Sequence, residues 1–187
     1  MLRDLDIVAL IEDIFHRRGA ESYLGEAITM SQHMLQAAAR AERDNRDDEV
    51  VAAALLHDIG HYTNEFPEDA LEQDMDNFHQ NAGARVLEGY FSKRIVDCVK
   101  FHVDAKRYLC STREGYYEDL SDASKHSLAL QGGPYNEQEV EEFAKQDFLD
   151  DILTVRICDD LGKDASLVTP DFAHFRPLLE KVVIQPT

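Results

Sequence analysis

The stretch Val50-Val51-Ala52-Ala53-Ala54-Leu55-Leu56-His57-Asp58-Ile59-Gly60 carries an unbroken apolar run that ends in a histidine and an aspartate. We expect a short, buried helix over 50–57, broken at Gly60 because glycine readily adopts the backbone conformations that end helices. Neighbouring residues on a helix point about 100° apart. His57 and Asp58 can therefore reach one locus only where it lies against the helix end, and a carboxylate placed there can bridge two cations.

Apolar residues recur at helical spacing along most of the remaining chain. No segment alternates apolar and polar residues well enough to predict a strand, and no repeat or linker divides the sequence. The expected fold class is all-α: a single-domain helical bundle over 1–187, with an irregular tail over 166–187 that contains Pro170 and Pro177. Further helices are expected from Ile7 to Gly19, from an N-cap at Ser31, over 77–91, from Ser92 towards Leu109, from Ser121 to Gln131, from a capping box at Asn136, and over 148–161.

The charge of the chain limits its partners. The formal net charge is −18, so the surface would repel phosphate backbones and anionic membranes. We expect no nucleic-acid or membrane partner, and an anionic substrate would need a local cluster of cations. The first residues mix acidic with apolar side chains, unlike a secretory signal, and three cysteines without close pairing suit a reducing compartment. The expected location is the cytoplasm.

Possible metal ligands recur along the chain, each from a different predicted helix or its end. An isolated histidine on an apolar helix face is more often structural than a ligand, so the inference rests on the joint pattern. Imidazole and carboxylate together suit iron, manganese or zinc. The set consists of His33, His57 with Asp58, His79, His102 and Asp159, with the adjacent Asp160 as a rival to Asp159.

This order of ligands resembles the six-ligand version of the HD-domain superfamily, a helical bundle that holds two metals. Within that superfamily, the sequence is similar to the mixed-valent diiron oxygenases of the PhnZ and TmpB type, which cleave the carbon–phosphorus bond of organophosphonates. The resemblance covers an HD-domain core from about residue 23 to 163. The most specific strings are Ala105-Lys106-Arg107-Tyr108-Leu109, Leu120-Ser121-Asp122-Ala123-Ser124-Lys125 and Gln131-Gly132-Gly133-Pro134.

The resemblance implies a cofactor of two iron ions, Fe(II) and Fe(III), bridged by the carboxylate of Asp58. Asp159 is preferred to Asp160 because, as in the family's motif, it follows Arg156 by three residues and precedes Lys163 by four. By the same match, His33, His57 and Asp159 would hold one iron, and His79 and His102 the other.

A phosphonate site is also implied, and it would provide cations inside an acidic protein. From the sequence alone, Lys106 and Arg156 would be interpreted as solvated side chains. Tyr23 and Glu26 match a gating pair, in which the tyrosine fills an open iron position until substrate enters and the glutamate receives the substrate's amino group. Residues three apart share one face of a helix, which allows this pairing. The matching phosphonate-binding residues are His61, Lys106, Ser124, Ser127 and Arg156.

The implied activity is O2-dependent C–P bond cleavage of 1-hydroxy-2-(trimethylammonio)ethylphosphonate or 2-amino-1-hydroxyethylphosphonate, giving glycine betaine or glycine plus phosphate. A preceding Fe(II)/2-oxoglutarate hydroxylase would supply the substrate. Met30 lies four residues after Glu26 and could share its face. A thioether suits the methyl groups of a quaternary ammonium, so the trimethylated substrate is favoured.

Two other functions remain open on the sequence. A metal-dependent phosphohydrolase acting on a nucleotide or phosphomonoester would use the same metal ligands, without a gating tyrosine and without O2. An inactive HD module would serve as a ligand sensor or a partner-binding domain. A complete set of ligands argues against the inactive module, since such a module has no need of them.

Overall fold

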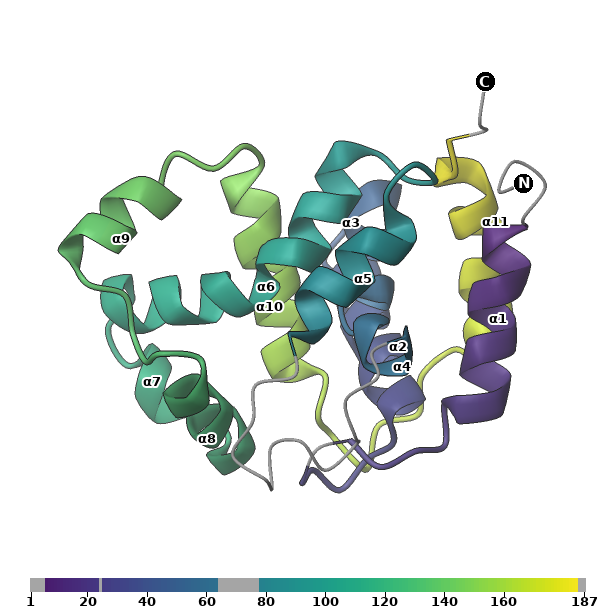
Figure 1. Ribbon diagram of the computed structural model, residues 1–187. Helices are drawn as coiled ribbons and strands as arrows, with labels where there is room; N and C mark the ends of the chain where they lie inside the picture. Colours follow the sequence, from purple (N-terminus) through teal and green to yellow (C-terminus); the bar gives the residue numbers. More distant parts are fainter. Residues whose placement is uncertain (1–5, 24, 64–77, 185–187) are drawn as a thin grey trace.

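The structure is a computed structural model that describes residues 6–23, 25–63 and 78–184. Within these ranges every regular element is a helix, and the strand-like contacts are isolated bridges. The all-α prediction is thereby confirmed (Figure 1). The helices are α1 (Ile7–Arg18), α2 (Met30–Arg43), α3 (Asp48–Leu56), α4 (Gly60–Thr63), α5 (His79–Leu87), α6 (Lys93–Thr112), α7 (Tyr116–Asp119), α8 (Asp122–Leu130), α9 (Glu137–Phe143), α10 (Leu149–Leu161) and α11 (Phe172–Val182).

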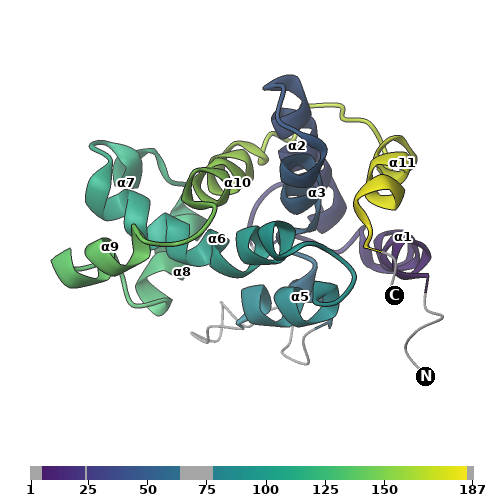
Figure 2. The same cartoon turned by 90° about the horizontal axis from the view of Figure 1, so that it is seen from above.

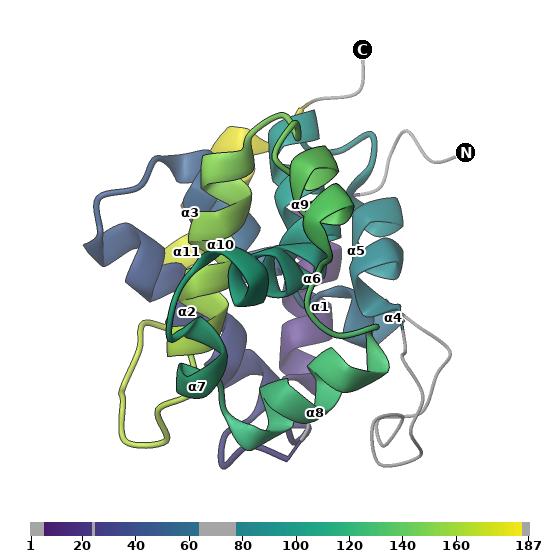
Figure 3. The same cartoon turned by 90° about the vertical axis from the view of Figure 1, so that its left-hand side faces the viewer.

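Four helices, α2, α3, α6 and α10, form the centre of the bundle. α2 packs against α3 and α10, while α6 packs against the same two helices. α5 lies between α4 and α6, and α11 covers α3 and α1. Helices α7, α8 and α9 gather at the end of the molecule away from α1 and α11 (Figures 1 and 2), and Figure 3 faces that end.

The central helices meet through apolar side chains and small residues. Met34, Ala37, Ala38 and Ala41 on α2 are all fully buried, and the alanines let α2 approach its neighbours closely. α3 is buried along its whole apolar run, as the lack of alternation predicted. This close packing brings the ligand-bearing ends of α2 and α3 together.

Several helix starts occur where the sequence predicted them. The hydroxyl of Ser92 accepts a hydrogen bond from the backbone N–H of Ile95, and Ser121 caps α8 in the same way. Asn136 and Glu139 form the predicted capping box at α9. Side-chain acceptors at these positions satisfy backbone donors that have no partner inside the helix.

The start of α2 differs from the prediction. The N-cap is Thr29 rather than Ser31, because the hydroxyl of Thr29 accepts from the N–H of Gln32. The side-chain carbonyl of Gln32 in turn accepts from the N–H of Thr29 at 2.8 Å, which completes a capping box. Ser31 instead lies inside the first turn of the helix.

The prediction that Gly60 breaks the helix after His57 was wrong in detail. α3 ends at Leu56, and Gly60 begins α4. A Cβ on Gly60 would lie 1.8 Å from the carbonyl oxygen of His79 and 2.6 Å from the backbone nitrogen of Gly83. Glycine is therefore required by the close approach of α4 to α5, which holds the chain after Asp58 against His79.

The expected irregular tail over 166–187 was also wrong, because residues 172–182 form helix α11. Asp171 caps this helix, and Phe172, Phe175 and Leu179 are buried along one face. Pro177 lies inside the helix, where proline costs about 3 kcal/mol. Burial of the apolar face against α1 and α3 opposes this cost.

None of the helices in the described ranges combines the length and the apolar character that a membrane span requires.

Candidate metal centre

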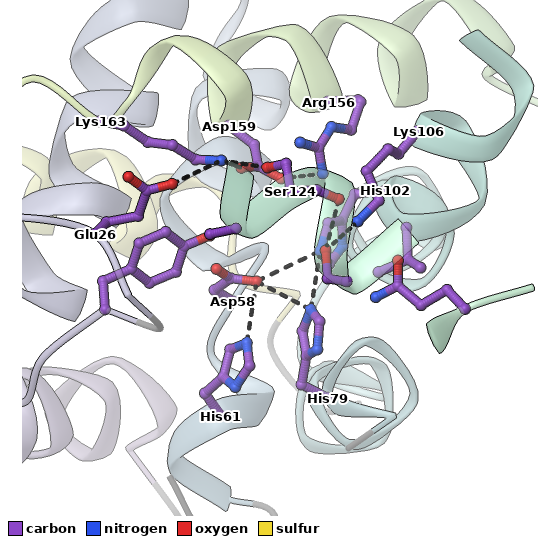
Figure 4. A pocket seen from close by; sticks show the side chains of 15 residues that line it. Glu26, Asp58, His61, His79, His102, Lys106, Ser124, Arg156, Asp159 and Lys163 are labelled. Atoms are coloured by element: carbon purple, nitrogen blue, oxygen red, sulfur yellow. Dashed lines mark hydrogen bonds and ion pairs between the residues drawn. The ribbon is translucent and has the colours of Figure 1, made fainter. Parts of the chain in front are cut away.

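Six side chains proposed as metal ligands converge from five places in the fold. Each is buried, and Figure 4 shows several of them around one cavity. Because an unpaired buried charge is costly, so many buried ionisable groups indicate a shared partner. His33 lies on α2, His57 follows α3, Asp58 comes next in the chain, His79 begins α5, His102 lies within α6 and Asp159 lies within α10.

The carboxylate of Asp58 stands between two groups of these ligands. On one side, its Oδ2 lies 3.4 Å from the Nε2 of His33 and 3.4 Å from the Nε2 of His57. On the other side, its Oδ1 lies 3.1 Å from the Nε2 of His79 and 3.4 Å from that of His102. A carboxylate that directs each oxygen to a different group of imidazoles has the arrangement of a bridging ligand between two cations.

Asp159 belongs to the first of these groups. Its Oδ1 lies 3.4 Å from the Nε2 of His33, and its Oδ2 lies 3.9 Å from the Nε2 of His57. The neighbouring Asp160 points elsewhere, to the guanidinium of Arg156 and the hydroxyl of Tyr116. The geometry thus favours Asp159 over its rival as the ligand.

Backbone carbonyls orient three of the rings. The Nδ1 of His33 lies 2.8 Å from the carbonyl of Gly162, that of His57 lies 2.8 Å from Ala54, and that of His102 lies 2.7 Å from Val99. An Nδ1 that donates its proton to a carbonyl leaves the Nε2 lone pair free for a metal. The second nitrogen of each ring points into the centre.

The Nε2 lone pairs of these histidines point toward one another, with no hydrogen-bond donor group between them among the described residues. The Nε2 atoms of His33 and His57 are 3.0 Å apart, and those of His79 and His102 are 3.1 Å apart. Asp58 Oδ2 and Asp159 Oδ1 are buried without a hydrogen-bond partner. Converging acceptors with no donor fit a bound cation in each group, so these residues could hold a metal.

The pKa shifts show that this arrangement of carboxylates and imidazoles favours positive charge. Burial would raise the pKa of Asp58, but His57, His61 and the other nearby imidazoles hold that pKa well below its usual range. Burial lowers the pKa of His102 to about 4, leaving a neutral ring. Burial opposes protonation of His33 as well, yet the carboxylates of Asp159 and Asp58 beside it raise the pKa of His33 to about 9. The carboxylates of Asp58 and Asp159 thus favour a positive charge at the position between them.

The cavity beside the metal centre is lined by most of the residues that the resemblance assigns to substrate. Its cationic wall consists of Lys106, Arg156 and Lys163, with Ser124 and Ser127 between them. The ammonium of Lys106 donates to the hydroxyl of Ser127 at 2.7 Å. Arg156 donates to Asp159 at 2.6 Å as well as to Asp160. The structure brings these predicted phosphonate residues together.

His61 lies at the junction of the metal centre and the cavity. Its ring stacks on that of His79 with centroids 3.9 Å apart, and its Nε2 is 3.7 Å from Asp58 Oδ1. Burial lowers the pKa of His61 well below its usual value, so the ring is neutral. By position His61 is also a rival metal ligand, since Asp58, His61 and His79 form a group compact enough to hold an ion.

Tyr23 and Glu26 both line the cavity, but a helix does not bring them there. They precede α2, and the N–H of Glu26 donates to the carbonyl of Tyr23 at 2.7 Å. The ring of Tyr23 stacks on the His33 ring with centroids 3.9 Å apart. Burial raises the pKa of the Tyr23 phenol well above its usual value, so it keeps its proton.

Met30 is the substrate residue that the structure does not support. Its side chain is buried in the hydrophobic core and is absent from the cavity wall. The spacing argument was wrong because α2 begins at Met30, so Glu26 and Met30 share no helix face. Thr29, between them, is the N-cap of α2 and has extended backbone angles (φ −87°, ψ 162°), so Glu26 lies outside the helix.

Sequence reasoning gave no role at the cavity to Lys163 and Gln131, which line it, or to Ser121, which contacts the cavity residue Glu26. The hydroxyl of Ser121 donates to Glu26 Oε1 at 2.7 Å, although Ser121 also caps α8. Lys163 was noted only as a motif position, yet it reaches the cavity. Its spacing of four residues from Asp159 was the available signal, because residues four apart on or near a helix can face the same side.

Comparison with known proteins agrees with this architecture. The family model described as HD domain matches residues 30–130. A [1-hydroxy-2-(trimethylamino)ethyl]phosphonate dioxygenase (glycine-betaine-forming) from Leisingera caerulea is 50% identical over 178 residues, covering 95% of this chain and 91% of the relative. A hydroxymethylphosphonate dioxygenase from Gimesia maris is 37% identical over 161 residues, covering 86% and 80%. The ligands, the helical bundle and these matches lead to one conclusion: the chain belongs to the HD-domain family.

Proposed function

We propose that this protein is an oxygenase that uses O2 to cleave the C–P bond of [1-hydroxy-2-(trimethylamino)ethyl]phosphonate, giving glycine betaine and phosphate. The observation that carries the proposal is the shared cavity. Four of the six candidate ligands line the same cavity as the cationic wall of Lys106, Arg156 and Lys163; they are Asp58, His79, His102 and Asp159. The relative from Leisingera caerulea, named for this reaction, matches 95% of the chain.

The two metals are proposed to be iron, as Fe(II) and Fe(III), because the histidine and carboxylate set suits iron among other divalent metals. When bound, such a pair would supply Lewis acidity for the hydroxyphosphonate and electrons for reaction with O2. Asp58 would bridge the two ions. His33, His57 and Asp159 would complete one protein shell, and His79 and His102 the other, in keeping with the distances around Asp58.

The chain's own residues would hold the substrate at both ends. His61, Lys106, Ser124, Ser127 and Arg156 would bind the phosphonate, since charge-assisted hydrogen bonds from ammonium and guanidinium groups suit its oxygens. Glu26 would face the cationic nitrogen, and its carboxylate is already oriented by the hydroxyl of Ser121. Tyr23, stacked on His33 at the cavity wall, is proposed to withdraw when substrate enters.

The overall reaction balances without an external reductant. The hydroxyphosphonate and one O2 contain together all the atoms of glycine betaine and phosphoric acid, so O2 accepts all four electrons released. The substrate needs a hydroxyl group on the carbon that bears phosphorus. We propose that a Fe(II)/2-oxoglutarate hydroxylase supplies it.

The whole chain, 1–187, is proposed to work as one domain in the cytoplasm. Helices α1 and α11 share the hydrophobic core of the ligand-bearing helices, which supports a single domain. The three cysteines, Cys98, Cys110 and Cys158, are free thiols, which is typical of a reducing compartment.

Phosphate release from iron-loaded protein, with and without O2, tests the proposal. We expect release from the trimethylated hydroxyphosphonate in air and none under argon. Release under argon, or release from nucleotides or phosphomonoesters, would favour the phosphohydrolase instead. A higher kcat/KM for 2-amino-1-hydroxyethylphosphonate would overturn the choice of the trimethylated substrate.

A further inference from the structure

Lys163 stands at the junction of the phosphonate wall and the gating pair. It follows the end of α10 by two residues. Its ammonium donates to the hydroxyl of Ser124 at 2.8 Å, lies 3.9 Å from Glu26 Oε1 and 4.0 Å from Asp159 Oδ1. Figure 4 shows Lys163 between Glu26 and Asp159, facing the cavity. The side chain of Lys163 is largely buried, so water has little access to its ammonium.

Two serines on one face of α8 each accept a hydrogen bond from a lysine outside that helix. Lys106 donates to Ser127, and Lys163 donates to Ser124, three residues earlier on the same helix face. Ser127 directs its own proton to the backbone carbonyl of Ser124. Lys163 and Ser124 thus repeat, at the other end of this face, the pairing that the resemblance assigns to phosphonate binding through Lys106 and Ser127.

Among the cations of the cavity wall, Lys163 has no carboxylate within hydrogen-bond distance in the described part of the chain. A phosphonate dianion carries two negative charges. Arg156 is already neutralised by two carboxylates, Asp159 and Asp160. Burial lowers the pKa of Lys106 to about 7, so Lys106 is only partly charged at neutral pH. The nearest carboxylates to the Lys163 ammonium lie at 3.9 and 4.0 Å, beyond hydrogen-bond distance.

We propose that Lys163 is a further substrate-binding residue, whose ammonium binds the phosphonate group together with the hydroxyl of Ser124. The inference rests on the proposed function for the identity of the ligand. It places Lys163 and Lys106 on the same anion, one at each end of the Ser124–Ser127 face.

A different role would be to orient Glu26 for the substrate's cationic nitrogen. The distances favour the phosphonate role, because Ser124 is within hydrogen-bond distance of Lys163 and Glu26 is not. Glu26 also has a donor of its own in Ser121. The two roles differ in which ligand they affect, so an anion without a nitrogen separates them.

Binding of inorganic phosphate to the metal-loaded protein, followed by calorimetry without O2, tests the proposal directly. Lys163→Met keeps the length of the side chain and removes its charge. We expect the Kd for phosphate to rise about tenfold or more, as for loss of a hydrogen bond to a charged group, and Lys163→Arg to recover most of the affinity. Lys125→Met is the matched control, since Lys125 neighbours Ser124 but bonds to the carbonyl of Glu118 outside the cavity.

A second measurement compares KM for hydroxymethylphosphonate, which has no nitrogen, with KM for the trimethylated substrate. Lys163→Met should raise both, whereas Glu26→Gln should raise only the second. Unchanged phosphate binding in Lys163→Met, or an effect confined to the trimethylated substrate, overturns the proposal. Phosphate binding requires no turnover, so this result stays informative even where the wild-type protein fails to cleave either phosphonate and the proposed function is wrong.

Discussion

The ammonium of Lys106 and the hydroxyl of Ser127 lie 2.7 Å apart, and both side chains are buried. A lysine that has left water is stabilised in its neutral form, because the charged form loses hydration. Burial, aided by the nearby Arg156, lowers the pKa of Lys106 to about 7. The charge of this anion-binding residue therefore changes within the physiological pH range.

Anion affinity should consequently fall as the pH rises. Below pH 7 Lys106 carries its proton and attracts phosphate. Above pH 7 it is neutral, so between pH 7 and 8.5 the Kd for phosphate should increase up to about tenfold. Calorimetric titration across this range measures the change.

Lys106→Arg is the control for that experiment, because a guanidinium stays charged throughout. Titration of phosphate itself is the same for both proteins, so the difference between the two profiles belongs to residue 106. Identical profiles would show that Lys106 does not titrate near pH 7.

Replacing each of the two neighbouring aspartates on α10 should have a different effect on metal content. Asp159 faces His33 and His57, whereas Asp160 bonds to Arg156 and Tyr116. Asp159→Ala should lower the iron content from about two per chain to about one or less. Asp160→Ala should retain both metals and instead raise KM, because it loosens Arg156. Elemental analysis of both variants checks this, and equal metal loss would contradict the assignment.

Metal binding should stabilise the fold. The metal-free centre holds two buried carboxylate oxygens without partners and imidazole lone pairs at 3.0 Å. Fe(II) added without O2, at about 100 times its Kd, should contribute about 2.7 kcal/mol and raise Tm by roughly 5–10 °C for a chain of this size. Thermal unfolding of Asp58→Asn gives the comparison, since its Tm should respond little to the metal. A wild-type Tm that ignores Fe(II) would count against the site.

Gly60→Ala should damage the centre without touching a ligand. The new Cβ would meet the His79 carbonyl at 1.8 Å and the Gly83 nitrogen at 2.6 Å, and neither backbone atom can move alone. We expect a loss of about 3 kcal/mol in the free energy of unfolding, together with reduced metal content because His79 shifts. Gly83→Ala, whose nearest contact would be a side-chain carbon of Val99 at 3.1 Å, should cost much less. Urea unfolding compares the two variants.

Local chemistry made part of the fold predictable. The caps at Ser92, Ser121 and Asn136 depend on residues within one turn, and all three occur as expected. Pro177 misled the prediction of the tail, since the cost of a proline is local while the burial that opposes it comes from α1 and α3. Sequence spacing contains the first effect but not the second.

The candidate site likewise combines features that the sequence predicts with contacts that form only in the folded molecule. The candidate ligands could be proposed because each occupies a characteristic place in the family pattern, and the structure brings all six together. The role of Met30 failed because it assumed helix geometry from Glu26 to Met30, whereas α2 begins only at Met30, after the N-cap Thr29. Lys163 was not recognised, because its partners Ser124 and Glu26 are 39 and 137 positions away in the chain and meet it only in the folded molecule.

The bond between the His33 ring and the Gly162 carbonyl joins two points that are 129 positions apart. One turn along α2, Gln36 bonds to the backbone of Asp164 through both its amide nitrogen and its oxygen. A ribosome must therefore synthesise nearly the whole chain before His33 acquires its orientation and Asp159 its place. A chain that terminates before the end of α10 lacks the Gly162 carbonyl that orients His33.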